Sequence, residues 1–187
     1  MIEIKPHFVR SGRQIEEKYG VRNWLELIHT EKQYVNIDNV EEVYEIIHDD
    51  KFSTRHIQML FTITYDQEVI AGFNVPSAHD LWLTYLNAAE EVINYGESRR
   101  QYGIDPYIIE LKSLNQEFLH LSIYQEFDRT NKCVDAQLPY QAFLVSLLKA
   151  IQHFYTKMNN DYEQSFEDER IEIRVESLIC RVVNYPI

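Results

Sequence analysis

The chain has 187 residues, of which 45% are hydrophobic and 26% are charged. These values are typical of a folded globular protein and exclude a disordered chain. The 30 acidic residues outnumber the 18 Lys and Arg residues, which gives a formal net charge of −12. Because nucleic-acid binding depends on Lys and Arg that neutralise phosphates, this charge argues against direct binding of DNA or RNA.

The sequence has no pattern typical of a secreted or membrane-bound protein. Its N-terminal residues lack the basic and apolar regions of a signal peptide. No apolar run approaches the roughly 20 residues that a bilayer-spanning helix needs. Cys133 and Cys180 are too few for a disulfide framework and are expected to be free thiols. A cytoplasmic location without membrane contact is therefore predicted.

Short helices are predicted in residues 1–50. Residues 1–9 alternate weakly between apolar and polar and fit a short strand or an arm. Ser11 and Gln14 have the spacing of a capping box, which indicates the start of a helix. A further helix is expected over residues 40–48, where four apolar residues fall on one stripe.

Two units of similar layout are predicted in the middle of the chain, over residues 55–96 and 107–158. Each has a run that fits two paired strands, then a proline, then a helix with a broad apolar face. The helices are expected over residues 81–93 and 143–158. The polar segment 97–105 is interpreted as the connection between the units.

Strands are predicted at the C-terminal end, over residues 169–183. Ile171, Ile173 and Val175 alternate with charged residues, as in a strand with one buried face. The alternation then shifts by one residue, which a β-bulge near Ser177 would explain.

These elements predict a single α+β domain over residues 1–187. We expect one antiparallel sheet of about six strands, two long helices packed on one face, and short N-terminal helices. A parallel doubly wound sheet is excluded because too few helices separate the strands.

Catalytic and cofactor-binding signatures are missing from the sequence. It contains no Gly-rich phosphate loop, no His-Glu-x-x-His, no Cys-x-x-Cys and no Gly-x-Ser-x-Gly. Two of the seven histidines adjoin acids, at His48-Asp49-Asp50 and His79-Asp80, and both positions are interpreted as helix ends. No cofactor and no metal site are therefore predicted, and a non-enzymatic protein is favoured.

One enzymatic alternative stays open around Glu110 and Lys112. The spacing Glu-x-Lys occurs in metal-dependent nucleases, where a carboxylate holds the ion and a lysine orients the attacking water. Strand alternation places both side chains on one face, and Asp105 is a candidate third group. The same spacing is common on the solvent face of an ordinary strand.

The favoured hypothesis is an acidic protein-binding module, such as an immunity-type inhibitor of a basic toxin or nuclease. The negative charge would steer a basic partner, and the 13 tyrosines offer aromatic anchors. The residues expected to bind the partner are Glu41, Glu42, Tyr44, Glu45, Asp49, Asp50 and Tyr65.

Two further alternatives stay open beside this hypothesis. One is an acidic DNA mimic, which would occupy a nucleic-acid enzyme through rows of carboxylates at phosphate-like spacing. The other is a structural subunit that forms a homodimer through an uncovered sheet face.

Overall fold

The computed structural model describes residues 1–49, 52–164, 166 and 170–184. Its mixture of helices and antiparallel strands confirms the predicted α+β class. The strands are β1 (Ile2–Val9), β2 (Tyr34–Asn36), β3 (Gln58–Tyr65), β4 (Glu68–Ala71), β5 (Ala78–His79), β6 (Glu97–Gln101), β7 (Tyr107–Ser113), β8 (Phe118–Gln125) and β9 (Asp128–Pro139). The helices are α1 (Gly12–Tyr19), α2 (Val40–Ile47), α3 (Leu81–Tyr95), α4 (Tyr140–Thr156) and α5 (Ile171–Val183), with short helical turns η1 (Trp24–Leu27), η2 (Glu31–Gln33) and η3 (Lys157–Asp161).

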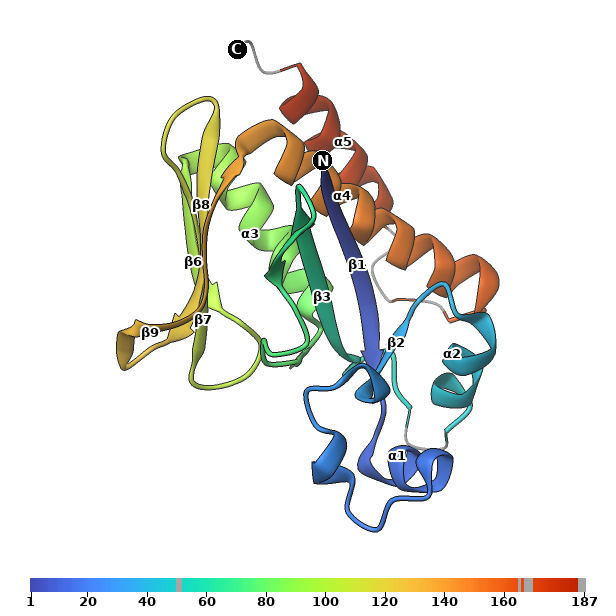
Figure 1. Cartoon of the computed structure of the whole chain (residues 1–187). Coiled ribbons are helices and arrows are strands. Elements are labelled where there is room, and N and C mark those ends of the chain that lie inside the picture. The colour runs from blue at the N-terminus through green and yellow to red at the C-terminus, as the bar shows by residue number, and fades with distance from the viewer. Residues whose placement is uncertain (50–51, 165, 167–169, 185–187) are drawn as a thin grey trace.

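The strands form two separate antiparallel sheets, so the prediction of one sheet of about six strands is wrong. The first sheet has the order β2-β1-β3-β4 with β5 paired to β3, and the second has the order β6-β7-β8-β9. Helix α3 lies between them and contacts both β3 and the β6–β7 pair (Figure 1). The buried residues of α3 are spread around more than one side of the helix, so the helix can pack against two sheets. It therefore separates two layers of strands.

The two segments predicted as hairpin–helix units each contain strands followed by a long helix. The first gives β3, β4 and α3, and the second gives β7, β8, β9 and α4. Helix α3 ends at Gly96, whose φ of 81° lies in the left-handed region that favours glycine. The segment 97–105 is more than a connection, because its first five residues form β6 and pair with β7. The sequence of this strand, which includes Arg99 and Arg100, has no apolar alternation from which a strand could be predicted. An edge strand can form without apolar residues.

The C-terminal prediction of strands over residues 169–183 is wrong, because this segment forms helix α5. Residue 169 lies outside the described residues. Ile171, Val175, Leu178 and Val182 are all buried and recur at helical spacing. Ile173, which a strand would have buried, is 69% exposed. The break in alternation near Ser177 was therefore a sign of helical periodicity and not of a bulge.

The N-terminal region contains one long strand as well as the predicted short helices. Strand β1 lies inside the first sheet, between β2 and β3. The capping box is confirmed, since the Gln14 amide donates to Ser11 Oγ and the Ser11 amide donates to Gln14 Oε1. Asn39 accepts from the Glu42 amide and caps α2. These caps satisfy backbone amides in the first turns of α1 and α2.

An aromatic cluster fills the space between the first sheet and the helices. The ring of Phe154 on α4 lies 6.0 Å from Phe8 on β1 and 6.1 Å from Trp82 on α3. Phe166 packs against Trp82 and stacks on Tyr155 at 5.1 Å. The cluster therefore ties β1, α3 and α4 together. In the described part of the chain no helix is long and apolar enough to cross a membrane.

Candidate functional site

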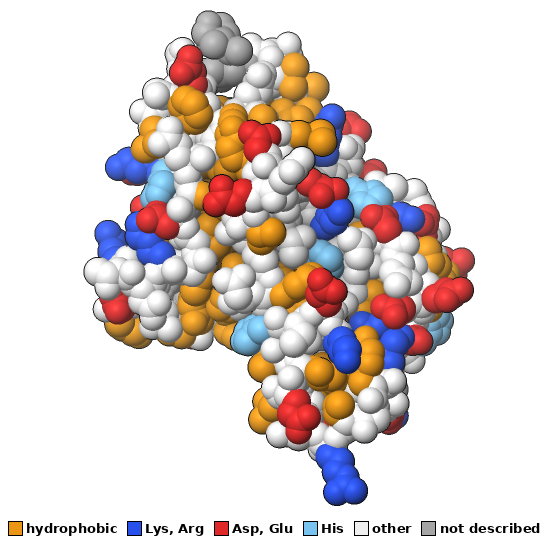
Figure 2. All heavy atoms as spheres, in the orientation of Figure 1, with side chains coloured by type: hydrophobic (Ala, Val, Ile, Leu, Met, Phe, Trp, Pro, Cys, Tyr) orange, Lys and Arg blue, Asp and Glu red, His pale blue; other side chains and the backbone are white. Residues whose placement is uncertain are grey.

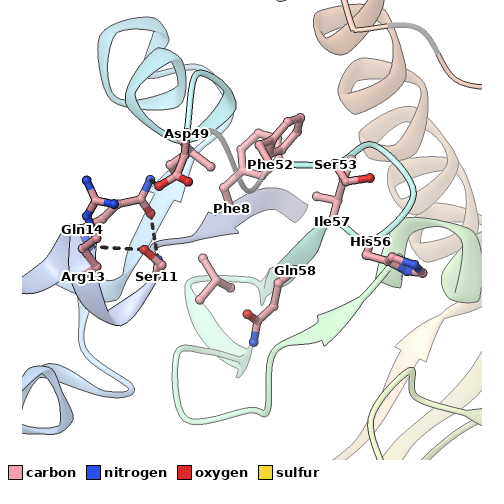
Figure 3. A pocket seen from close by; sticks show the side chains of 12 residues that line it. Phe8, Ser11, Arg13, Gln14, Asp49, Phe52, Ser53, His56, Ile57 and Gln58 are labelled. Atoms are coloured by element: carbon pink, nitrogen blue, oxygen red, sulfur yellow. Dashed lines mark hydrogen bonds between the residues drawn. The ribbon is translucent and has the colours of Figure 1, made fainter.

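A surface hollow of about 330 Å³ lies where the end of β1 meets α1, α2 and the segment before β3 (Figure 3). Its volume is at the lower end of the range for ligand and side-chain pockets. The apolar part of its wall is formed by Phe8, Val9, Ile46, Phe52 and Ile57. The ring of Phe52 meets Phe8 edge-on at 6.3 Å, so two aromatic rings shape this wall.

Polar side chains surround the apolar wall. They come from four segments of the chain and comprise Ser11, Arg13, Gln14, Asp49, Ser53, His56 and Gln58. Gln14 Nε2 donates to Asp49 at 3.3 Å and joins α1 to the end of α2 (Figure 3). The arrangement offers an apolar surface inside and charged or hydrogen-bonding groups at the opening.

A second, polar recess of about 410 Å³ adjoins the hollow and shares Arg13, Gln14 and Asp49 with it. Its other lining side chains include Glu17 and Glu45, both acidic. The hollow and the recess together form one continuous surface, apolar at one end and charged at the other.

Glu42, one of the residues predicted to bind the partner, forms two ion pairs within the molecule. Its Oε2 lies 2.6 Å from Nη2 of Arg10, a residue that is only 3% exposed. Its other oxygen lies 3.1 Å from Nζ of Lys18. Burial raises the pKa of Glu42, but the contacts with Arg10 and Lys18 outweigh it and the net pKa is lowered. Glu42 therefore holds α2 to β1 and α1.

Replacing Glu42 by Gln is expected to lower the free energy of unfolding by about 2 kcal/mol, because Arg10 is left as an unpaired buried charge. The loss is smaller than for a fully buried pair, since Glu42 is 30% exposed. A carboxylate with a lowered pKa stabilises the fold above its unfolded-state pKa. The difference between wild type and variant in urea denaturation should therefore be full at pH 7 and shrink as the pH falls below about 4.5. A difference that is equally large at pH 3 would contradict this role.

The other residues of α2 that were predicted to bind the partner are Glu41, Tyr44 and Glu45. Some of them make contacts within the molecule, and some are exposed. Glu45 forms an ion pair with Lys18 at 2.7 Å and lines the polar recess. Glu41 is exposed in the first turn of α2. Tyr44 is 39% exposed, but its hydroxyl donates to the carbonyl of Asp161 at 2.9 Å and so ties α2 to η3.

The predicted set of binding residues does not form one surface. Tyr65 lies at the end of β3 next to Ile2, whereas Phe8 in the hollow pairs with Met59 at the start of that strand. Six residues of extended chain separate these positions, roughly 20 Å. Asp50 lies outside the described residues. Of the predicted residues, Glu45 and Asp49 are the ones that line the hollow or its recess.

Glu110 and Lys112 do lie on one face, the face of the second sheet that points away from α3, and both line a recess of about 480 Å³. Glu110 accepts a hydrogen bond from the Tyr124 hydroxyl at 2.9 Å. Asp105 does not join them, since it lies in the β6–β7 loop and accepts from Gln101 at 2.6 Å. Among the described residues no group of three or more His, Cys, Asp or Glu side chains is arranged to hold a metal ion.

Charged side chains are interspersed on the face shown in Figure 2, where acidic, basic and hydrophobic groups alternate over short distances. Within the fold described above, the carboxylates of Glu42 and Glu45 pair with Arg10 and Lys18. A DNA mimic needs unbroken rows of carboxylates, and this face has none.

The hollow could not be identified from the sequence. Its wall combines the end of β1, one residue of α2 and two residues from the segment before β3, which are far apart along the chain. Phe52 and Ile57 are apolar, and apolar side chains are often buried against another part of the fold. Nothing in the sequence indicated that this contact would leave an open space.

The fold and the hollow define an α+β protein of two antiparallel sheets with an apolar-walled surface site. Comparison with known protein families, with curated proteins and with solved structures found no significant match.

Proposed function

We propose that this protein is a non-enzymatic, cytoplasmic protein-binding module that takes an apolar side chain of its partner into the hollow between α1, α2 and β1. The observation that supports the proposal is the combination of an apolar wall with a polar rim. Protein interfaces often concentrate their binding energy in such a pocket, where a few buried anchors are surrounded by polar contacts that exclude water.

The charge of the protein supports a basic partner. Glu45 and Asp49 line the hollow or its recess, and Glu41 is exposed on the same helix. With a net charge of −12, the whole molecule attracts a cationic protein over a distance of about one Debye length. An immunity-type inhibitor of a basic toxin or nuclease is the specific form of this function that we favour.

The residues proposed to bind the partner differ in part from the set predicted from the sequence. Glu41, Glu45 and Asp49 remain in the set. The apolar wall, represented by Phe52, joins them as the surface that receives the anchor. Tyr65 leaves the set because it lies at the opposite end of β3.

Filling the hollow is the sharpest test of the proposal. Ser53 is exposed at its rim, so Ser53→Trp should block the hollow without removing a buried contact. Ser177→Trp on the exposed side of α5 is a matched control. Each immobilised protein is exposed to a lysate of the native host, and the retained proteins are quantified by mass spectrometry.

A basic protein should be retained by wild type and by Ser177→Trp, and its recovery should fall at least about tenfold with Ser53→Trp, the loss of one anchor contact. Its retention by wild type should also fall as salt rises from about 0.05 M to 0.5 M, because long-range attraction between charges is screened. Equal retention by both variants, or retention that does not depend on salt, would refute the proposal.

A further inference from the structure

Strand β6 has an open edge at the outside of the second sheet. In the described part of the chain β6 pairs with β7, and no strand pairs with its other side. The remaining outer strands are differently placed, since β4 and β9 lie against each other and β2 lies next to α2 and η2. An open strand edge presents unpaired backbone groups and can accept a further strand.

The backbone register shows which groups point outwards from β6. The Tyr102 amide donates to the Tyr107 carbonyl at 2.9 Å, and the Ser113 amide donates to the Gly96 carbonyl at 2.7 Å. Hydrogen-bonded residues alternate along an antiparallel strand, so the even-numbered residues of β6 bond to β7. The amides and carbonyls of Glu97, Arg99 and Gln101 consequently face the open edge.

A recess of about 480 Å³ runs beside this edge. Its lining comes from the end of α3, from β6 and from β7, and includes the side chain of Tyr95, which is 77% exposed. On the α3 side, Ser98 Oγ donates to Glu91 Oε2 at 2.6 Å. A recess therefore borders the unpaired edge of β6.

The charges on the outer face of this edge alternate in sign. Glu97 on β6 lies opposite Lys112 on β7, and Arg99 lies opposite Glu110. Arg99 Nε also donates to the hydroxyl of Tyr124 at 3.2 Å, which orients the guanidinium on this face. An acid and a base two residues apart on one face are complementary to the same pair on a strand that runs the opposite way.

We propose that the occupant of this edge is a second copy of the chain, paired antiparallel through β6 about a twofold axis at Ser98. In this register Glu97 faces Arg99 of the partner subunit, and Arg99 faces Glu97 of the partner subunit. Four side chains then lie in a row across the dimer, and their charges alternate in sign. The row runs from Lys112 to Glu97 in one protomer and continues with Arg99 and Glu110 of the partner subunit. Two hydrogen-bonded residue pairs form, and the two sheets join into one of eight strands.

The charge pattern selects this register from its neighbours. An axis at Arg99 would pair more residues, but it would place Arg99 directly opposite its own copy, which is unfavourable. An axis at Arg100 would set Arg99 opposite Gln101 and leave Glu97 without a partner charge. The short overlap of two five-residue strands gives an interface smaller than the standard of roughly 1,600 Å², so the dimer is weak and depends on concentration.

The experiment measures the dimer dissociation constant by sedimentation equilibrium of the full chain. Glu97→Arg and Arg99→Glu each place like charges opposite one another at two symmetry-related positions. Each should weaken the dimer about tenfold. The double variant Glu97→Arg with Arg99→Glu makes the pairs opposed across the dimer complementary again and should restore association to within about threefold of wild type. The like charges that it sets against Lys112 and Glu110 lie within each protomer and are present in monomer and dimer alike.

A backbone variant tests the strand pairing separately from charge. Arg99→Pro removes an amide that points to the open edge, a position where an edge strand tolerates proline. It should abolish dimerisation while the thermal unfolding of the diluted monomer changes little. Glu68→Arg on β4 is the control for a change of surface charge, and it should leave the dissociation constant unchanged.

Three results would overturn the proposal. They are a chain that stays monomeric at millimolar concentration, a dimer indifferent to the single reversals, and a double variant that associates no better than either single one. Because β6 is separated from the hollow by α3 and the first sheet (Figure 1), failure of this dimer would leave the proposed function untouched.

Discussion

Phe154→Ala is expected to lower the free energy of unfolding by about 3–5 kcal/mol, the usual cost of deleting a fully buried aromatic side chain. Phe154 has no exposed surface, and its ring packs between Phe8 and Trp82. Its removal leaves a cavity at the point where β1, α3 and α4 meet. Urea denaturation followed by circular dichroism measures the loss.

Phe127→Ala is a matched control for this variant, because Phe127 lies between β8 and β9 and is 89% exposed. The control should change the free energy of unfolding by less than about 0.5 kcal/mol. Similar losses for both variants would mean that the aromatic cluster does not hold the layers together. Phe8 belongs both to the wall of the hollow and to the aromatic cluster, so its removal would also destabilise the fold. The hollow is therefore better tested by filling it than by deleting Phe8.

The second large effect is a loss of stability in mild acid that depends on His7. This residue is 8% exposed, and burial, assisted by the charge of nearby Lys5, lowers its pKa from 6.5 to about 4. The folded state therefore holds His7 neutral, while the unfolded state takes up a proton below pH 6.5. Stability is full above that pH and falls by about 2 kcal/mol between pH 7 and pH 5, reaching about 3 kcal/mol near pH 4.

His7→Gln should remove this pH dependence, because Gln does not titrate and can still bond to Thr62, which now lies 3.1 Å from His7 Nε2. His48→Gln, at an exposed position, should keep the slope of wild type. The measurement is the free energy of unfolding in urea at pH 7, 6 and 5. If the free energy of unfolding of His7→Gln falls with pH as steeply as that of wild type, other groups cause the acid sensitivity.

Much of the fold could be predicted from local signals in the sequence. The capping box at Ser11 and the apolar stripes of α3 and α4 depend on neighbouring residues, and all three were correct. Helix α5 was missed because Ile171, Ile173 and Val175 satisfy a strand and only the later residues break the pattern. The division into two sheets was missed because it depends on which strands meet in space.

The candidate site was less predictable than the fold. Asp49 was identified through its charge, and the structure places it at the rim of the hollow. Glu42 had the same appearance in sequence but pairs with Arg10, and nothing local to either residue indicates that pairing. The apolar wall depends on residues brought together by the packing of β1 against α2 and the segment before β3. Long-range contacts of this kind leave no periodic trace in a single sequence.

The central claim is that the hollow receives a side chain of a protein partner, and photo-crosslinking tests it most directly. A photoreactive phenylalanine analogue is placed at position 53 at the rim, and in a second protein at position 177 on α5. Both proteins are irradiated in a lysate of the native host, and the adducts are identified by mass spectrometry. We predict that position 53 captures one basic protein through a peptide with an apolar residue, whereas position 177 does not capture it. The same adducts from both positions, or none from position 53, would contradict the account.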